Sequence, residues 1–237
     1  MANKIAMPDQ VPPPTSLPAE TLVSIDCGQV TLEGRLIFPR NADGVVLYAH
    51  GASSGRHNPR NHRVAAEFAT AGMATLLVDL LTEDEEAIDQ QNTHLRFDIG
   101  LLAERLCKVT RWLTSDSRTS DLPIGYFASG ASGGAALVAA VKHRTRVGAV
   151  VLRSGQPDLA EDALPLVQAP TLLIVGAKDL PGLQTNEDSM EHLGASVKQL
   201  AVVCGASYLF EEPGKQDEVC QLAIDWFARY LDATNRS

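Results

Sequence analysis

Several features that mark particular classes of protein are missing from this sequence of 237 residues. No apolar run approaches the roughly 20 residues that a membrane-spanning helix needs, and the first twenty residues lack the apolar core of an export signal. Clustered Lys and Arg are missing too, and the formal net charge is −9. This charge argues against nucleic acid as a partner, because binding to a phosphate backbone depends on grouped positive charge. We therefore expect a protein that binds neither membranes nor nucleic acids.

Signatures of metal and cofactor binding are also missing. Cys27, Cys107, Cys204 and Cys220 lie far apart and form no C-x-x-C pair, so their spacing indicates neither a zinc site nor a disulfide framework. The chain contains no G-x-G-x-x-G turn, which argues against a dinucleotide-binding fold. We expect buried free thiols in a cytoplasmic protein that uses no metal and no cofactor.

What the sequence does contain is an alternation of strand and helix patterns. Short apolar runs rich in β-branched residues, typical of strands buried on both faces, are GVVLYAH, ATLLVDL, PIGYFA, VGAVVLR, PTLLIVG and KQLAVVC. Apolar residues three and four apart predict amphipathic helices over residues 93–114 and 215–231. Together with the alternating segment VTLEGRLIF, this order predicts a three-layer α/β fold: a mostly parallel sheet with an antiparallel N-terminal strand pair and helices on both faces.

The length suits one hydrophobic core. We expect a single domain over residues 21–237, after a proline-rich and poorly ordered lead-in over residues 1–20. The acidic run at residues 83–86 predicts a solvated loop without a function. In sheets of this kind, ligands bind beyond the carboxyl ends of the strands, so the chemistry is expected in the segments that follow the apolar runs.

Long segments of the chain resemble one family. LYAHGASSGRHNPRN, ATLLVDLLTEDEEAID, THLRFDIGLLAERL, PTLLIVGAKDLPGLQTNED and LFEEPG look like the corresponding segments of dienelactone hydrolase-like proteins, a branch of the α/β-hydrolase superfamily. The similarity runs from about residue 23 to the C-terminus. It implies the α/β-hydrolase fold and three catalytic positions: a Ser or Cys nucleophile on a sharp turn after the central strand, an Asp after a later strand, and a His after the last strand.

Two of these three positions can be read directly from the resemblance. The acid position falls on Asp179, in VGAKDLP. The His position falls on Tyr208, because the chain reads GASYLFEEPG where the family has G-A-S-H-L-F or G-A-T-H-L-F. A phenol with a reference pKa of about 10 stays protonated near neutrality and cannot relay a proton as an imidazole does. His57 falls in a loop expected to approach the site, but it would need a different geometry to replace this base.

The nucleophile position has two candidate registers. Residues 130–134 read GASGG, which spells the nucleophile signature G-x-S-x-G with Ser132 at its centre. When the chain is aligned without a gap on the family pattern I-G-Y-F-G-A-S-T-G, Gly130 falls at the nucleophile position. Ser132 then lies in the first turn of the next helix. We favour the ungapped register, because both flanks match and the alternative needs two extra residues in the strand and two fewer in the helix.

The rest of the predicted pocket does not depend on a triad. By resemblance, the backbone N–H groups of Ala52 and Ala131 would form an oxyanion hole, with Ser129 or Ser132 close by. Four arginines would suit an anionic substrate, although salt bridges would account for each of them equally well. They are Arg56, Arg60, Arg96 and Arg153.

Efficient Ser-His-Asp hydrolysis is therefore not expected. The leading interpretation is a protein that binds a small carbonyl-containing molecule and either performs a lyase, isomerase or cyclase step or serves as a ligand-binding protein. Tyr208 would donate a hydrogen bond or a proton, and Asp179 would be its partner or a base. The two competing interpretations are an esterase or lactonase that uses Ser132 and a catalytically inactive scaffold. The sequence leaves the oligomeric state open.

Overall fold

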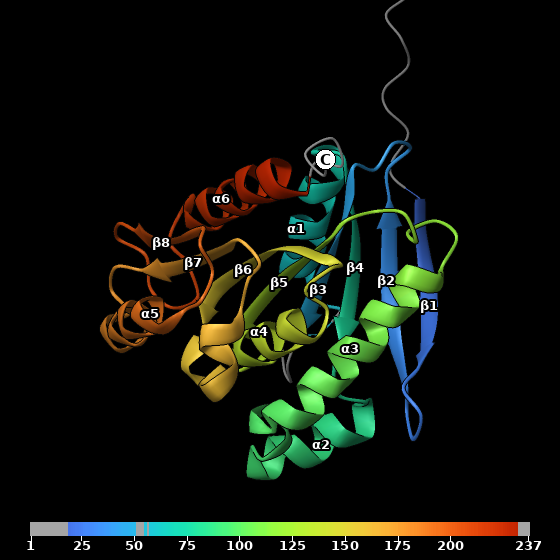
Figure 1. The fold of residues 1–237 in the computed structure, drawn as a ribbon, viewed down its shortest axis with the longest axis horizontal. Coiled ribbons are helices and arrows are strands. Elements are labelled where there is room, and N and C mark those ends of the chain that lie inside the picture. The colour runs from blue at the N-terminus through green and yellow to red at the C-terminus, as the bar shows by residue number, and fades with distance from the viewer. Residues whose placement is uncertain (1–18, 51–54, 56, 232–237) are drawn as a thin grey trace, which may run out of the picture.

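The computed structural model describes residues 19–50, 55 and 57–231, which contain one eight-stranded sheet flanked by helices (Figure 1). The strands are β1 (Ala19–Asp26), β2 (Thr31–Phe38), β3 (Gly44–His50), β4 (Met73–Asp79), β5 (Ile124–Gly130), β6 (Val147–Gly155), β7 (Thr171–Gly176) and β8 (Lys198–Val203). The helices are α1 (Pro59–Thr70), α2 (Glu83–Asn92), α3 (Ile99–Ser115), α4 (Ser132–Lys142), α5 (Leu180–His192) and α6 (Lys215–Tyr230), with 3-10 helices η1 (Leu95–Phe97) and η2 (Pro157–Leu166).

The sheet topology confirms the expected fold class. The strand order is β1-β2-β4-β3-β5-β6-β7-β8. The pairs β1–β2 and β2–β4 are antiparallel, and the pairs from β4 through β8 are parallel. Helices α1 and α6 cover one face, whereas α3, α4, α5 and η2 cover the other (Figure 1). The carboxyl ends of β5, β6 and β7 consequently lie next to one another at one edge of the sheet.

The acidic run at residues 83–86 is not a loop, contrary to expectation, but the first turn of α2. Thr82 caps this helix, since its Oγ1 accepts a hydrogen bond from the Glu85 N–H and Glu85 Oε2 accepts one from the Thr82 N–H. Negative side chains at a helix N-terminus are stabilised by the helix dipole. The sequence pattern concealed the helix because α2 buries no apolar side chain, only the carboxylate of Asp89.

Two predicted boundaries are also corrected. The strand β1 begins at Ala19, inside the expected lead-in, and residues 1–18 lie outside the described part of the chain. Helix α3 begins at Ile99 rather than at residue 93, because Thr93 ends α2 with a left-handed φ of 54° and η1 intervenes. In the part of the chain that the structure covers, the helices are too short or too polar to cross a bilayer.

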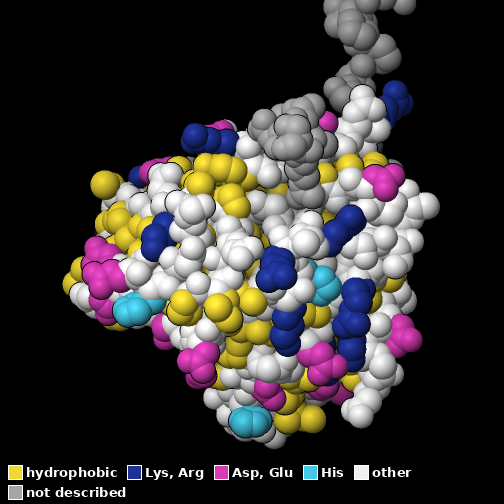
Figure 2. All heavy atoms as spheres, viewed as in Figure 1, with side chains coloured by type: hydrophobic (Ala, Val, Ile, Leu, Met, Phe, Trp, Pro, Cys, Tyr) yellow, Lys and Arg dark blue, Asp and Glu magenta, His cyan; other side chains and the backbone are white. Residues whose placement is uncertain are grey.

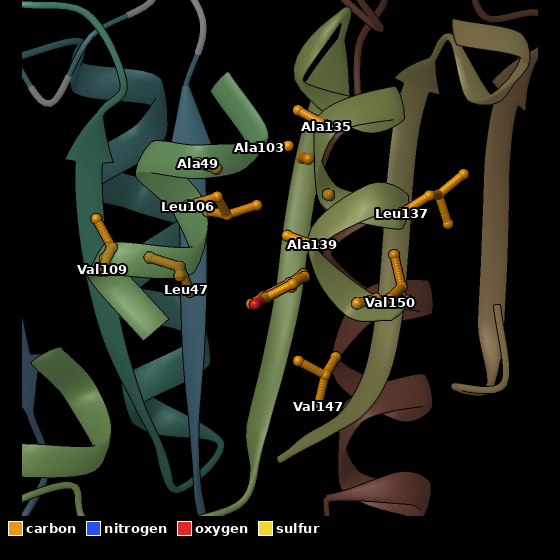
Figure 3. Packing of buried hydrophobic residues seen from close by; sticks show 14 of the residues in the cluster. Leu47, Ala49, Ala103, Leu106, Val109, Ala135, Leu137, Ala139, Val147 and Val150 are labelled. Atoms are coloured by element: carbon orange, nitrogen blue, oxygen red, sulfur yellow. The ribbon is translucent and has the colours of Figure 1, made fainter. Parts of the chain in front are cut away.

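Small residues let α4 lie close to the sheet. Figure 3 shows Ala135 and Ala139 of α4 beside β5, with Val150 of β6 close by. At the start of the helix, a Cβ atom built on Gly134 would come within 2.8 Å of Leu159 Cβ in η2. The first turn of α4 is therefore held between the sheet and η2, and this fixes the turn that precedes it.

Candidate functional site

The turn between β5 and α4 is the centre of the candidate site. Gly130, the last residue of β5, has a φ of 56°, a left-handed conformation that is costly for residues with a Cβ atom. Ala131 already has helical dihedrals, and α4 begins at Ser132. The carbonyl oxygen of Gly130 accepts a hydrogen bond from the Gln156 N–H at 3.0 Å, which ties the turn to the end of β6. The chain therefore passes from strand to helix at Gly130.

Ser132 lies within the first turn of α4. The residue is 1% exposed, and among the described residues its hydroxyl oxygen has no hydrogen-bond partner. This hydroxyl is enclosed by protein rather than presented to solvent. A substrate would have to displace the surrounding chain to reach it.

Tyr208 approaches the turn from the loop that follows β8. A Cβ atom built on Gly130 would lie 3.4 Å from Tyr208 Oη, so the phenol hydroxyl lies beside the position that a side chain at residue 130 would occupy. The Tyr208 residue is 48% exposed. The loop thus places a hydroxyl group, rather than an imidazole, against the strand–helix turn.

Three contacts hold the Tyr208 loop in place. Ser154, at the end of β6 with a φ of 43°, donates its hydroxyl to the carbonyl oxygen of Tyr208 at 2.9 Å. Glu212 accepts the Ser207 N–H with both carboxylate oxygens, at 3.0 and 3.1 Å, and it also pairs with Lys178 at 3.3 Å. These hydrogen bonds, above all the one from the Ser207 N–H, lower the pKa of Glu212 to about 2. The loop is therefore anchored to β6, to itself and to the segment after β7.

Asp179 shares a cleft with Tyr208. It caps α5, because its Oδ1 accepts the Gly182 N–H at 3.1 Å. Its Oδ2 is buried and has no hydrogen-bond partner within the described residues, so Tyr208 does not bond to it. The cleft has a volume of about 220 Å³ and is lined by Ser154, Gly155, Gln156, Asp158, Asp179, Pro181, Gly182, Thr185 and Tyr208. Its described lining contains two carboxylates and no Lys, Arg or His.

Asn186 packs beside this region, although no sequence motif marks it as a site residue. The residue is 1% exposed, and its Nδ2 donates to the carbonyl oxygens of Gly155 (3.1 Å) and Gly182 (2.8 Å), both of which line the cleft. Its Oδ1 is buried and, within the described chain, unpaired. Because its position depends on how α5 packs against the end of β6, no local motif marks it.

His50 lies at the same edge of the sheet, but its imidazole cannot act as a general base. It pairs in register with Asp79 of β4, and its ring centroid is 3.9 Å from that of Tyr48. Burial and the positive charge of Arg153 lower the pKa of His50 to about 3. The imidazole is therefore uncharged near neutrality and too weakly basic to accept a proton efficiently.

The three predicted arginines that the structure describes do not line the cleft. Arg153 pairs with Ser129 across β5 and β6, and it borders a separate small depression with Arg60, beside α1 and α6. Arg60 forms an ion pair with Glu211 at 2.7 Å. Arg96 forms one at 2.6 Å with the buried carboxylate of Asp89.

Of the other predicted residues, the structure describes some and not others. Ala131 precedes α4, where its backbone N–H follows the turn at Gly130. His57 is exposed just before α1, and Ala52 and Arg56 lie outside the described residues. Among the residues that are described, no three His, Cys, Asp or Glu side chains are grouped to hold a metal ion.

Solved structures share this architecture. The dienelactone hydrolase from Anabaena variabilis ATCC 29413 is 54% identical, with a TM-score of 0.87 over 91% of this chain and 100% of that chain. Est1E from Butyrivibrio proteoclasticus (TM-score 0.71, 13% identity, 87% of this chain and 99% of that one) shares the fold alone. So does a dienelactone hydrolase-like promiscuous phosphotriesterase from metagenomic libraries (TM-score 0.73, 16% identity, 91% and 99%). No family model matches the chain.

Two curated relatives match the chain over only part of their own length. Proteins named as phosphoribosyl transferases in two strains of Mycobacterium tuberculosis are 48% identical to the chain over 209 residues. That segment is 88% of this chain and 46% of theirs. The chain thus spans about half the length of the curated relatives it matches.

Proposed function

The chain belongs to the dienelactone hydrolase family, and from this membership and the geometry of its cleft we propose that it binds a small carbonyl compound without hydrolysing it through a serine. The cleft would serve either a non-hydrolytic step of the lyase, isomerase or cyclase type or ligand binding alone. The observation that carries the proposal is the pairing of Gly130 with Tyr208. The distance from a built Cβ on Gly130 to Tyr208 Oη is 3.4 Å, so the Tyr208 hydroxyl touches the place that a side chain at residue 130 would occupy.

The proposal assigns Gly130 to the nucleophile position and Tyr208 to the base position. The positive φ of Gly130 and the start of α4 at Ser132 support the ungapped register, and the burial of Ser132 argues against its use as a nucleophile. A glycine has no atom that can attack a carbonyl. In a serine hydrolase, loss of the nucleophile or of the histidine alone costs about 10⁶ in rate and leaves ~10³ to 10⁴ over the uncatalysed reaction.

The groups that remain can bind and polarise a carbonyl. The Tyr208 hydroxyl can donate to the carbonyl oxygen, and the N–H of Ala131 at the start of α4 is a second donor. Asp179, which lines the cleft together with Tyr208, would be the group that accepts a proton or a hydrogen bond. With these groups, protonation of a carbonyl oxygen and removal of a proton need no covalent intermediate.

We do not transfer the phosphoribosyl transferase activity in the relatives' name to this chain. The chain spans 46% of those proteins, and a phosphate group needs cations or grouped N–H donors to hold it. The described lining of the cleft has no Lys or Arg and has two carboxylates. The cleft is therefore poorly suited to a phosphate.

The test is to restore the missing side chains. A Gly130→Ser/Tyr208→His double variant should hydrolyse p-nitrophenyl acetate at least about 10²-fold faster than the unmodified protein, since it would regain an activated nucleophile. A fluorophosphonate probe should label this variant at position 130, as mass spectrometry of its peptides would show. Either single variant should stay near the background rate, because each lacks one member of the pair.

A Ser132→Ala change, made in both backgrounds, is the matched control. It should leave the rates of the unmodified protein and of the double variant unchanged. Serine-dependent hydrolysis by the unmodified protein that disappears in Ser132→Ala would overturn the proposal in favour of an esterase or lactonase. A protein that binds no carbonyl compound of any kind would instead be a scaffold.

A further inference from the structure

The end of β6 departs from regular strand geometry at Ser154. The last register pairs between β5 and β6 are Ser129 with Arg153 and Gly130 with Gly155. Two neighbouring residues of β5 thus face three of β6, and Ser154 is the residue in excess. Its φ of 43° is left-handed, which is unfavourable for a residue with a Cβ atom. Ser154 therefore forms a β-bulge, a feature that is uncommon between parallel strands and over-represented beside active sites.

The segment 154–156 is bonded to both sides of the candidate site. Ser154 donates its hydroxyl to the carbonyl oxygen of Tyr208 at 2.9 Å. Gln156, two residues further on, donates its N–H to the carbonyl oxygen of Gly130 at 3.0 Å. One short segment thus holds the backbone of both residues on whose contact the proposed function depends.

The phenol side chain of Tyr208 has little support of its own. It belongs to a residue that is 48% exposed, and no other described residue forms a hydrogen bond with its Oη. The position of this hydroxyl beside Gly130 consequently depends on where the backbone of residue 208 is held. Ser154 is only 5% exposed, so water has little access to the group that holds this backbone.

A second anchor of the same loop lies at the surface. Glu212 pairs with Lys178, whose side chain is 59% exposed. Figure 2 shows charged side chains of both signs over α5 and α6, on the left of the view. Salt screens interactions between exposed charges, but it does not screen a hydrogen bond between a neutral hydroxyl and a carbonyl group. Added salt can therefore separate the contribution of Ser154 from that of the surface charges.

We propose that Ser154 is a positioning residue, and that the bulge it forms sets the distance between the Tyr208 hydroxyl and the turn at Gly130. A strained residue persists only where its surroundings hold it in place, and such residues are concentrated at functional sites. Ser154 is held by its bond to Tyr208 and by its place between two buried strands. This inference rests on the proposed function and names a residue that acts on the same site through Tyr208.

The direct test follows Tyr208 by NMR in protein whose tyrosine rings carry an isotope label. Its signal is assigned, among those of the four tyrosines, by its loss in Tyr208→Phe. Ser154→Ala and Ser154→Gly should each shift this signal toward its position in the urea-unfolded protein, because neither side chain can donate to the carbonyl oxygen of residue 208. Addition of about 0.5 M NaCl to the unmodified protein should leave the signal in place. A signal that stays in place in both variants would overturn the proposal.

The two substitutions separate positioning from general stability. Glycine relieves left-handed strain, whereas alanine keeps it, so Ser154→Gly should unfold at a higher urea concentration than Ser154→Ala. The shift of the Tyr208 signal should nevertheless be equal in the two variants, since both lack the hydroxyl. A shift in Ser154→Ala alone would mean that Tyr208 responds to lost stability, and it would contradict a positioning role.

Ser189→Ala is the matched control. Ser189 is also a buried serine, 4% exposed, but it lies in α5 and does not line the cleft. Its replacement should leave the Tyr208 signal unchanged. A shift as large as in the Ser154 variants would show that loss of any buried hydroxyl disturbs the loop, and the proposal would fail.

Kinetics of the Gly130→Ser/Tyr208→His variant give a second measurement. Ser154 bonds to the backbone of residue 208, so the bond does not require the tyrosine ring. In this background, Ser154→Ala and Ser154→Gly should each lower kcat for p-nitrophenyl acetate about tenfold and change KM less than about twofold, because the base loses its alignment with the nucleophile. An unchanged kcat would overturn the proposal.

Failure of this inference is separable from failure of the proposed function, because the NMR measurement needs no activity. If the Ser154 variants shift the Tyr208 signal but Gly130→Ser/Tyr208→His stays inactive, the positioning role stands and the assignment of the two positions is wrong. If the double variant hydrolyses esters and the Ser154 variants change neither the signal nor kcat, the assignment stands and the role of Ser154 is wrong.

Discussion

The left-handed backbone of Gly130 has an energetic consequence that can be measured. At a φ of 56°, a residue with a Cβ atom is strained by about 1–2 kcal/mol. Among the described residues the space around the position is sufficient, since their closest atom to a built Cβ is Tyr208 Oη at 3.4 Å. The strain therefore lies in the backbone and not in a collision.

Gly130→Ala should lower the free energy of unfolding by about 1–2 kcal/mol, measured by urea denaturation. Gly205 is the matched position, because it has a φ of 73° and a built Cβ there meets no atom of the described residues within 4 Å. Gly205→Ala should cost about the same. A much larger loss for Gly130→Ala alone would reveal a steric clash at the turn and would contradict this account.

Individual site residues differ in how far the sequence could predict them. Asp179 and Tyr208 are predictable because they stand in segments that resemble a known family, and both line one cleft in the structure. Ser154 and Asn186 are not predictable in this way, since their hydrogen bonds join segments that are distant in the chain. For Arg153, the residue type suggested a substrate contact, but the alternation of the strand turns the side chain toward α1 and α6.

The loop between β8 and α6 is the element that carries Tyr208, and Glu212 is its internal anchor. The carboxylate accepts the Ser207 N–H, and its pKa is lowered to about 2 from an ordinary value near 4.3. A depressed carboxyl pKa means that its contribution to loop stability is present in full above about pH 4.3 and is lost as the pH falls toward 2.

The chemical shift of the Ser207 amide proton should therefore titrate with a midpoint at about pH 2, the pKa of Glu212. Glu212→Gln should abolish this titration and increase hydrogen exchange in the loop. Glu211→Gln is the control, because Glu211 bonds to Arg60 on the surface instead, and it should leave the midpoint unchanged. A midpoint near the ordinary carboxyl value in the unmodified protein would show that the Ser207 contact does not form in solution.

Among whole elements, the buried strands were the most predictable. β3, β4 and β7 are buried along their full length, so each reads as a continuous apolar run. Helix α2 was missed for the opposite reason, because its stability comes from a capping box and from the Glu85–Arg105 ion pair rather than from an apolar face. The length of a helix such as α3 was overestimated because its apolar spacing continues into η1.

At the scale of the whole molecule, the site depends on close contact between layers on the α4 side of the sheet. A Cβ on Gly134 would lie 2.8 Å from Leu159 Cβ and 3.0 Å from the Leu159 backbone carbon. Backbone atoms cannot rotate away as the end of a long side chain can. Any enlargement of residue 134 must therefore move α4 or η2, and both border the strand–helix turn or the cleft.

Gly134→Ala should destabilise the protein by about 1–3 kcal/mol through overpacking, more than the ~1 kcal/mol that alanine gains over glycine in helix propensity. Gly100→Ala in α3 is the matched control, since a Cβ there meets its closest neighbour at an ordinary 3.4 Å. That change should be neutral or stabilising. Thermal unfolding of both variants measures the difference, and equal stabilities would mean that the layers adjust without cost.

The absence of a side chain at Gly130 also determines how occupancy responds to ligand supply. In the ligand-binding form of the proposed function, no atom of Gly130 would form a bond with the ligand, and a bound molecule would leave unchanged. Occupancy then follows the free ligand concentration relative to Kd, and each bound molecule stabilises the fold by mass action. A hydrolase consumes the molecules that enter its site. The fraction of this protein with ligand bound would instead depend on the ligand concentration around it.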